Sequence, residues 1–197
     1  MQLKNMSKRT LLIAALVGVA LPAALQSSVK ERTMLPAENI PTLSKQEQVS
    51  FGLPARLKIP GISVDDGVEQ VGVTSEGEMG TPKGPVGVAW FSLGSRPGEV
   101  GSAVISGHYG WKNGIPAVFD NLYKLHPGDK LYVEDENGII TTFVVRELRR
   151  YGEHDDASNV FTSRDGKAHL NLVTCEGVWN KFSKSYSKRL VVFADKE

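Results

Sequence analysis

The stretch that decides the fold is "HLNLVTCEG" at His169–Gly177, where leucine and valine alternate with polar residues ahead of the only cysteine in the chain. This alternation predicts a β-strand over His169–Cys175 that ends at the thiol. A thiol without a partner is an intermolecular bridge, an inert buried group or a nucleophile. Composition alone does not choose among these three.

Short apolar segments of the same kind, separated by Gly, Pro, Asn and Asp, occur along residues 55–194. They are rich in the β-branched and aromatic residues that suit a pleated, half-buried strand. Besides His169–Cys175, the predicted strands are Ala55–Ile59, Val68–Val73, Val88–Phe91, Gly101–Ser106, Lys130–Asp135, Ile139–Tyr151 and Lys188–Ala194. Eight strands with one or two short helices predict a mostly-β fold, a closed or nearly closed eight-stranded β-barrel.

Two local signals refine this outline. Pro116 suits a first helical turn and the apolar residues after it fall near one face, so a helix is predicted over Ile115–Leu125. The segment "DENG" at Asp135–Gly138 predicts a hairpin with a type I′ turn, because Asn-Gly accepts positive φ angles.

Residues 1–28 have the layout of a signal peptide or signal anchor. Lys4, Lys8 and Arg9 occur without an acidic residue, and the uncharged segment Leu11–Leu25 follows. Fifteen residues span about 22 Å as a helix, less than the roughly 30 Å of a hydrocarbon core, which favours cleavage. No clean A-x-A triplet ends the segment, however, which favours an uncleaved anchor. We expect the chain to be exported whether or not the segment is cleaved. The basic residues before the segment are expected to stay on the cytoplasmic side of the membrane.

Residues 29–50 are polar and contain two prolines, which predicts a linker with a short helix over Ser44–Val49. Residues 51–197 are predicted to form one β-rich domain. The net charge of +1 comes from Lys and Arg spread along the chain, so no nucleic-acid partner is expected. Structural cysteines of exported proteins are normally paired, and the lone Cys175 is therefore unusual.

A nucleophilic cysteine needs a base or a cation beside it. His108 ends the apolar segment "GSAVISGH", so its imidazole is expected at the end of a strand, like the Cys175 thiol. His169 lies about 20 Å from Cys175 along an extended strand, too far for contact. His126 and His154 belong to polar loops. We therefore expect a thiol–imidazole pair from Cys175 and His108.

Arg189 begins the last predicted strand. A loop over Glu176–Lys188 followed by an antiparallel return would bring its guanidinium beside Cys175, where it could bind a substrate carbonyl or an oxyanion. The alternative interpretation is an edge charge that protects a strand from non-native pairing.

Three motifs resemble one known family. "SGH" (Ser106–His108), "LVTC" (Leu172–Cys175) and "KRLVVFA" (Lys188–Ala194) occur in the order found in sortases, cysteine transpeptidases of the Gram-positive cell surface. The similarity covers residues 55–196. The family signature TLxTC has Asn171 at its first position here. The segments "RLKIPGISVD", "GPVGVAWF" and "RPGEVGSAVISGH" look most like class F.

The resemblance implies a sortase-type barrel behind an N-terminal apolar anchor helix, and a substrate of the LPxTG type. Cys175 would attack the carbonyl of the Thr before Gly and form a thioacyl-enzyme, which an amine of a cell-wall precursor would open. His108 would act as general acid and then as base, and Arg189 would hold the carbonyl or the oxyanion. Thr174 and the backbone N–H of Glu176 are candidate substrate contacts.

Trp111 and Trp179 follow His108 and Cys175 and are candidate walls of the peptide groove. The resemblance implies surface proteins with an LPxTG-like signal as partners, and a catalytic domain on the outer face of the cell membrane. No cofactor is expected. The acidic loop with Glu153, Asp155 and Asp156 is a candidate Ca²⁺ site, although exposed carboxylates of this kind are more often only solvated.

Two other functions are compatible with the same residues. A secreted cysteine hydrolase would use water in place of the amine. A non-catalytic barrel would bind surface peptides and leave Cys175 inert.

Overall fold

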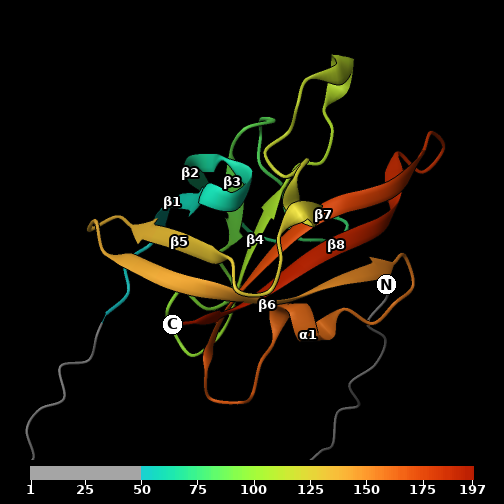
Figure 1. Cartoon of the computed structure of the whole chain (residues 1–197). Coiled ribbons are helices and arrows are strands. Elements are labelled where there is room, and N and C mark those ends of the chain that lie inside the picture. The colour runs from blue at the N-terminus through green and yellow to red at the C-terminus, as the bar shows by residue number, and fades with distance from the viewer. Residues whose placement is uncertain (1–49) are drawn as a thin grey trace, which may run out of the picture. The chain divides into compact units, whose positions relative to one another are not determined.

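The computed structural model describes residues 50–197, which form a closed β-barrel (Figure 1). The strands are β1 (Pro54–Ile59), β2 (Val64–Val71), β3 (Val88–Phe91), β4 (Gly101–Gly107), β5 (Lys130–Asp135), β6 (Ile140–Gly152), β7 (Ala168–Asn180) and β8 (Ser185–Lys196). Their order around the barrel is β1-β2-β3-β4-β7-β8-β6-β5, with β1 paired to β5 across the closure. The predicted fold class is confirmed.

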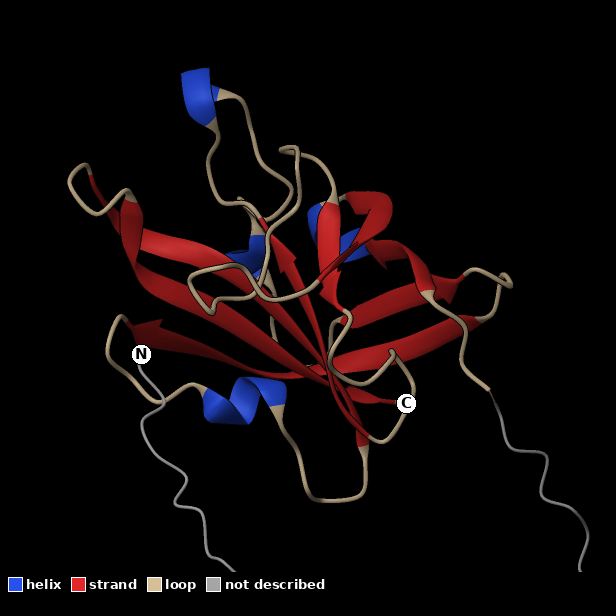
Figure 2. Ribbon diagram, turned by 180° about the vertical axis from the view of Figure 1, so that it is seen from behind, coloured by secondary structure: helices blue, strands red, loops and turns tan. Residues whose placement is uncertain are grey.

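Helices are few and short. The one α-helix, α1 (Ser158–Phe161), lies outside the strands (Figure 2), and 3₁₀ helices span Pro60–Ile62, Lys112–Gly114 and Leu122–Lys124 among the described residues. None of the helices within residues 50–197 is long and apolar enough to span a bilayer. The predicted signal or anchor segment 1–28 and the predicted helix over Ser44–Val49 lie outside the described residues.

The barrel interior holds the main core, because alternate side chains of every strand point inward. Its largest fully buried members are Phe119, Phe143, Leu57, Ile59, Ile105, Leu122, Leu131, Leu170, Leu172 and Leu190. A second cluster packs α1 against the outside of the sheet and consists of Val104, Tyr151, Val160, Val191 and Phe193.

The predicted helix over Ile115–Leu125 is wrong. The Asp120 carboxylate accepts hydrogen bonds from the N–H groups of Gly110 and Ala117, and the N–H of Phe119 donates to the carbonyl of His108. The bonds to Gly110 and His108 tie the segment to the loop after β4 instead of to its own preceding turn. Only the 3₁₀ turn Leu122–Lys124 remains, with Leu122 buried in the core.

Two further expectations are wrong in detail. The β5–β6 hairpin has no type I′ turn, because Gly138 has a positive φ of 78° and Asn137 does not. The Asp135 carboxylate instead accepts the N–H groups of Asn137 and Ile139 and shapes the turn. The loop expected over Glu176–Lys188 is a β-hairpin, since β7 and β8 continue to Asn180 and Ser185. Figure 1 shows this hairpin extending beyond the barrel.

Candidate active site

Cys175 lies within β7, and its direct partner on the neighbouring strand β8 is Arg189. The antiparallel return expected from the sequence is therefore present, although it passes through a hairpin and not a loop. Residues directly opposite each other in an antiparallel pair have Cβ atoms about 5 Å apart. The guanidinium is thus attached next to the thiol by the register of the two strands.

His108 directly follows β4, which runs parallel to β7. In this ladder Ser106 pairs with Val173, so the chain leaves β4 at the level of Cys175. The Thr174 hydroxyl donates a 2.8 Å hydrogen bond to the carbonyl of Gly107 and fastens the end of β4 to the middle of β7. The end of β4 therefore presents the imidazole at the level of the thiol on the neighbouring strand.

The position before His108 requires glycine. A Cβ atom on Gly107 would lie 2.5 Å from Cδ2 of Phe119, which is fully buried in the barrel. The ring of Phe119 fills the space where a side chain would be. Glycine at the strand end therefore lets β4 approach the core closely and fixes where His108 emerges.

The imidazole of His108 is oriented by two neighbours. Its Nε2 atom lies 2.8 Å from the carbonyl oxygen of Pro82. A carbonyl only accepts, so Nε2 carries the proton and Nδ1 is the atom of the neutral ring that can take one up. The ring also packs against Trp111, with centroids 4.6 Å apart.

The guanidinium of Arg189 is held by its own hairpin. Nη1 donates to the carbonyls of Tyr186 and Lys188, and Nη2 donates to the hydroxyl of Ser185. A guanidinium has five N–H groups, so this arrangement leaves two of them for another acceptor. A substrate carbonyl or an oxyanion is such an acceptor.

Two cavities meet at Cys175. Both are lined by Cys175, His108, Arg189 and Glu78. The first has a volume of about 380 Å³ and an apolar wall made of Met79, Ala157, Val160, Phe161, Val173 and Val191. The second has a volume of about 800 Å³ and an aromatic wall made of Tyr109, Trp111, Trp179 and Tyr186. A ligand in either cavity can reach the sulfur.

Burial dominates the electrostatics of the thiol. Cys175 is partly exposed and forms no disulfide, and burial raises its pKa. The Arg189 guanidinium opposes this and lowers the pKa, whereas the Glu78 carboxylate raises it further. The resting thiol therefore keeps its proton at neutral pH, and the arginine is the group that favours its ionisation.

The four predicted substrate contacts have different surroundings. Trp111 and Trp179 line the second cavity. Thr174 borders the first cavity, but its hydroxyl is buried and bonded to Gly107. The Glu176 carboxylate forms a two-point ion pair with Arg150 and lines neither cavity.

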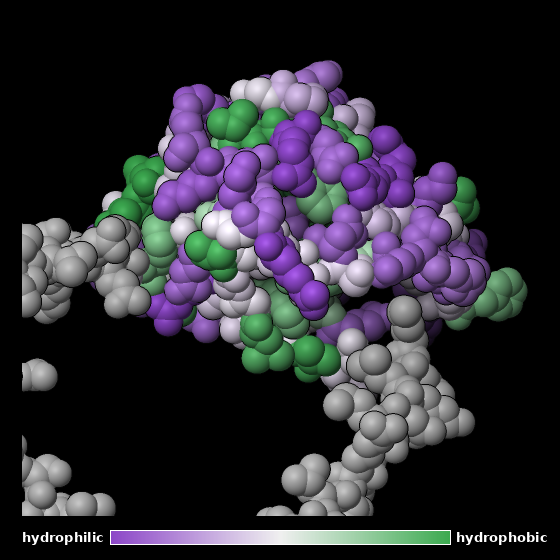
Figure 3. All heavy atoms as spheres, turned by 90° about the horizontal axis from the view of Figure 1, so that it is seen from below, coloured by the Kyte–Doolittle hydropathy of each residue, from purple (hydrophilic) through white to green (hydrophobic). Residues whose placement is uncertain are grey.

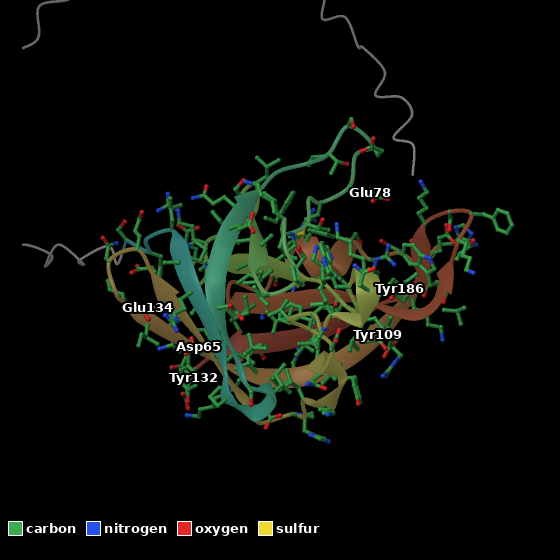
Figure 4. The ribbon with its side chains drawn as sticks, turned by 90° about the horizontal axis from the view of Figure 1, so that it is seen from above. Asp65, Glu78, Tyr109, Tyr132, Glu134 and Tyr186 are labelled. Atoms are coloured by element: carbon green, nitrogen blue, oxygen red, sulfur yellow. The ribbon has the colours of Figure 1, made fainter. Side chains whose placement is uncertain are left out.

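Sequence reasoning missed three residues of the site: Glu78, Tyr109 and Tyr186. Figure 4 shows the two tyrosines close together and Glu78 on the loop beyond them. The tyrosine rings are 5.5 Å apart in an edge-to-face arrangement. Glu78 belongs to a Gly-, Ser- and Pro-rich loop, and nothing in that composition indicates which residue turns toward the thiol.

The acidic loop after β6 uses its carboxylates on its own backbone. Asp155 accepts the N–H of Gly152, and Asp156 accepts the N–H of Ser158. Glu153 borders the first cavity. Within residues 50–197 no group of three or more His, Cys, Asp or Glu side chains is arranged to hold a metal ion.

Comparison with known proteins places this geometry in context. The family model "Sortase domain" matches residues 57–197. Similar solved structures include sortase C-1 from Actinomyces oris, with 24% identity, a TM-score of 0.57 and coverage of 73% of either chain. Sortase A from Corynebacterium diphtheriae, a lid mutant, has 22% identity and a TM-score of 0.58, covering 77% of this chain and 74% of that one.

A third similar structure is sortase C1 from Streptococcus agalactiae in complex with MTSET. It has 23% identity and a TM-score of 0.57, covering 74% of this chain and 69% of that one. At such identities these likenesses establish the fold. No curated protein sequence matches the chain.

Proposed function

The chain belongs to the sortase family, whose members are cysteine transpeptidases, and we propose that it transfers peptides bearing an LPxTG-like sorting signal to an amine. The observation that carries the proposal is the convergence of Cys175, His108 and Arg189 on the same two cavities. A sulfur nucleophile, a proton carrier and a fixed cation are the groups that acyl transfer needs.

In the proposed first step, the Cys175 sulfur attacks the carbonyl carbon of the threonine before glycine, and the thiol proton passes to His108. The free N–H groups of Arg189 stabilise the oxyanion. His108 then protonates the leaving amino group as the C–N bond breaks, and a thioester remains on Cys175. The apolar wall of the first cavity suits the leucine and proline side chains of the signal.

In the second step an acceptor amine attacks the thioester carbonyl, and His108 takes the proton that the amine loses. Collapse of the oxyanion forms the new amide and returns the thiolate, which regains its proton. A thioester is reactive enough for an amine to open it without further energy input. The acceptor that we propose is an amine of a cell-wall precursor.

The location follows from residues 1–28. We propose that they anchor the chain in the cell membrane and that residues 51–197 act on the outer face. The basic flank and the uncharged segment Leu11–Leu25 support this orientation. Protease treatment of intact cells should remove the catalytic domain while leaving a membrane-bound N-terminal fragment, and full protection of the domain would contradict it.

The proposed reaction is tested with the full chain, an LPxTG peptide library and a small amine, with products identified by mass spectrometry. We expect release of the fragment that begins with glycine and an amide between the threonine carbonyl and the amine. Cys175→Ala should abolish both products. His108→Ala and Arg189→Ala should lower turnover at least about a hundredfold, the usual size of such effects.

His126→Ala and Arg164→Ala are matched controls, since both residues are exposed. They should leave turnover unchanged. Fragment release without amide at any amine concentration would replace transfer by hydrolysis. Undiminished cleavage by Cys175→Ala would exclude the whole mechanism.

A further inference from the structure

The β7–β8 hairpin presents exposed apolar side chains at its tip. Phe182 is 99% exposed, Val178 76% and Trp179 47%. Such exposure of large apolar groups on a projecting element normally marks a surface that another phase or molecule covers. In the view from below, hydrophobic side chains stand out at the right-hand edge, the side on which this hairpin lies (Figure 3).

The same tip is strongly basic. Residues 178–184, which form the tip, contain Lys181 and Lys184 and no acidic residue, and Lys188 lies opposite Glu176 at the base of the hairpin. None of these lysines forms an ion pair with another residue in the range 50–197. An aromatic and apolar tip surrounded by unneutralised lysines combines the two features that bind proteins to anionic bilayer surfaces.

The acidic groups near the hairpin do not cancel this charge. Glu176 at its base is neutralised by Arg150. Asp120 is held by the backbone N–H groups of Gly110 and Ala117 and forms no ion pair with the lysines of the hairpin. Glu78 borders the cavity at Cys175, where Arg189 and Lys112 are also present. The cationic character of the tip therefore persists to the mouth of the second cavity.

We propose that the tip of the β7–β8 hairpin, residues 178–184, docks on the surface of an anionic lipid bilayer. The shape of the tip favours a bilayer over a protein partner. A stable protein interface involves roughly 20–30 residues on each side, whereas the tip consists only of residues 178–184. A few apolar side chains that enter the headgroup region by about 5–10 Å are enough for interfacial binding.

Docking has a consequence for the site. Trp179, Lys184 and Tyr186 of the hairpin line the second cavity. With the tip on the bilayer, the mouth of this cavity opens at the membrane surface. A reactant held in the headgroup region then reaches Cys175 without leaving that surface.

The test uses the full chain in the Cys175→Ala background, so it is independent of catalysis. An environment-sensitive fluorophore is attached to Ser183→Cys, and the protein is reconstituted into phosphatidylcholine vesicles with or without phosphatidylglycerol. We expect a blue-shifted emission, and quenching by a lipid-borne quencher, only with phosphatidylglycerol. High salt should reverse both changes, because surface electrostatics are screened.

The β5–β6 hairpin supplies a matched control. It also exposes apolar side chains, with Ile139 48% and Ile140 56% exposed, but residues 134–140 carry three acidic residues and no basic one. Figure 1 shows it projecting from the opposite side of the barrel. A fluorophore on Asn137→Cys should show neither the shift nor the quenching.

Substitutions at the tip decide the outcome. Phe182→Ser should abolish the blue shift at Ser183→Cys, and Lys181→Gln and Lys184→Gln should each lower the ratio of inserted to free tips about fivefold. Circular dichroism checks that the variants fold. An unchanged Ser183→Cys signal on phosphatidylglycerol, an equal shift at Asn137→Cys, or a shift that depends only on protein concentration would overturn the proposal.

Discussion

At the scale of single residues, neighbouring groups shift the pKa of the Cys175 thiol in opposite directions. Burial and Glu78 raise its pKa, and Arg189 lowers it from the adjacent strand. The resting enzyme therefore holds a protonated and unreactive sulfur. Arg189 contributes both to thiolate formation and, in the proposed reaction, to oxyanion binding.

This balance predicts how the pH profile of alkylation shifts. The rate of Cys175 alkylation by iodoacetamide should rise with pH, with its midpoint above that of an ordinary thiol because the pKa is raised. Arg189→Gln should move the midpoint to higher pH, since it removes the cation that stabilises the thiolate. Glu78→Gln should move it to lower pH. Shifts of the opposite sign would refute the assigned causes.

At the scale of elements, the parallel pair β4–β7 positions the site. Thr174 of β7 and Gly107 of β4 share a buried hydrogen bond next to His108 and Cys175. Backbone pairing and the buried apolar faces of the strands set the register of β4 and β7. The Thr174–Gly107 hydrogen bond adds a side-chain constraint on this register next to His108 and Cys175.

Removing the Thr174 hydroxyl should lower both the stability of the fold and the turnover. Thr174→Val leaves the Gly107 carbonyl without its partner and should lower the free energy of unfolding by about 1–3 kcal/mol. Thr174→Ser keeps the hydroxyl and should retain the wild-type turnover. Urea denaturation and peptide cleavage measure the two effects. Equal behaviour of the valine and serine variants would show that the hydroxyl does not position the site.

A buried histidine near the start of β7 contacts two carboxylates. His169 is buried, and its Nδ1 lies 2.7 Å from Asp195 while its Nε2 lies 3.0 Å from both Asp165 oxygens. The hydrogen bond from His169, with others from Lys167 and Ser163, lowers the pKa of Asp165 strongly. This arrangement joins the loop before β7 to the end of β8.

A lowered carboxyl pKa has a definite consequence for acid stability. The contribution of Asp165 is fully present above its unfolded pKa of about 3.9 and is lost as the pH falls toward the folded value. Asp165→Asn should therefore unfold at lower denaturant concentration at pH 7, and its difference from wild type should shrink below about pH 4.

At the scale of the whole molecule, residues near the two ends of the barrel domain are in contact with each other. Lys196 lies over the Phe51 ring at 4.4 Å, the Arg96 guanidinium donates to the Phe51 carbonyl, and Gly52 N–H donates to Asp135. The Phe51 ring also packs against Gly98. These contacts connect the segment before β1 to the last residues of β8 and to two loops.

Their loss should destabilise the barrel measurably. Phe51→Ala should lower the free energy of unfolding by about 1–2 kcal/mol, since it removes partly buried ring area and the cation–π contact. Lys196→Gln should cost only about 0.5–1 kcal/mol, because the ring remains in place. Thermal unfolding compares the two variants. An equal loss in both would show that the ring itself contributes nothing.

The sequence predicted the positions of the strands well, because Val, Ile, Leu and aromatic residues alternate between clear turn signals. It missed the continuation of β7 and β8 past Gly177, since "VWNKFSKSYS" mixes aromatic residues with lysine and serine without a regular alternation and its strands pair only with each other. The helix over Ile115–Leu125 failed because Asp120 and Phe119 bond to Gly110 and His108 in the loop after β4. Tertiary contacts of this kind leave no local pattern.

The candidate site was predictable only in part. The strand pattern predicted Cys175 and His108 at strand ends and Arg189 at a strand start, so their approach followed from this pattern and the family motifs. In the structure Cys175 and Arg189 lie within β7 and β8. Glu78, Tyr109 and Tyr186 join the site through loop paths and hairpin geometry that no periodicity records. The substitutions at Cys175, His108, Arg189 and Glu78 test the roles proposed for these four residues.

The pairing of β4 with β7 also governs when the enzyme can become active. These neighbours in space are separated along the chain by β5, β6 and α1, which gives the contact a large loop-closure entropy and makes it slow to form. Because β7 and β8 follow the other strands in the chain, the thiol meets the imidazole late in folding. A nascent chain therefore lacks the assembled thiol–imidazole pair until the barrel has closed.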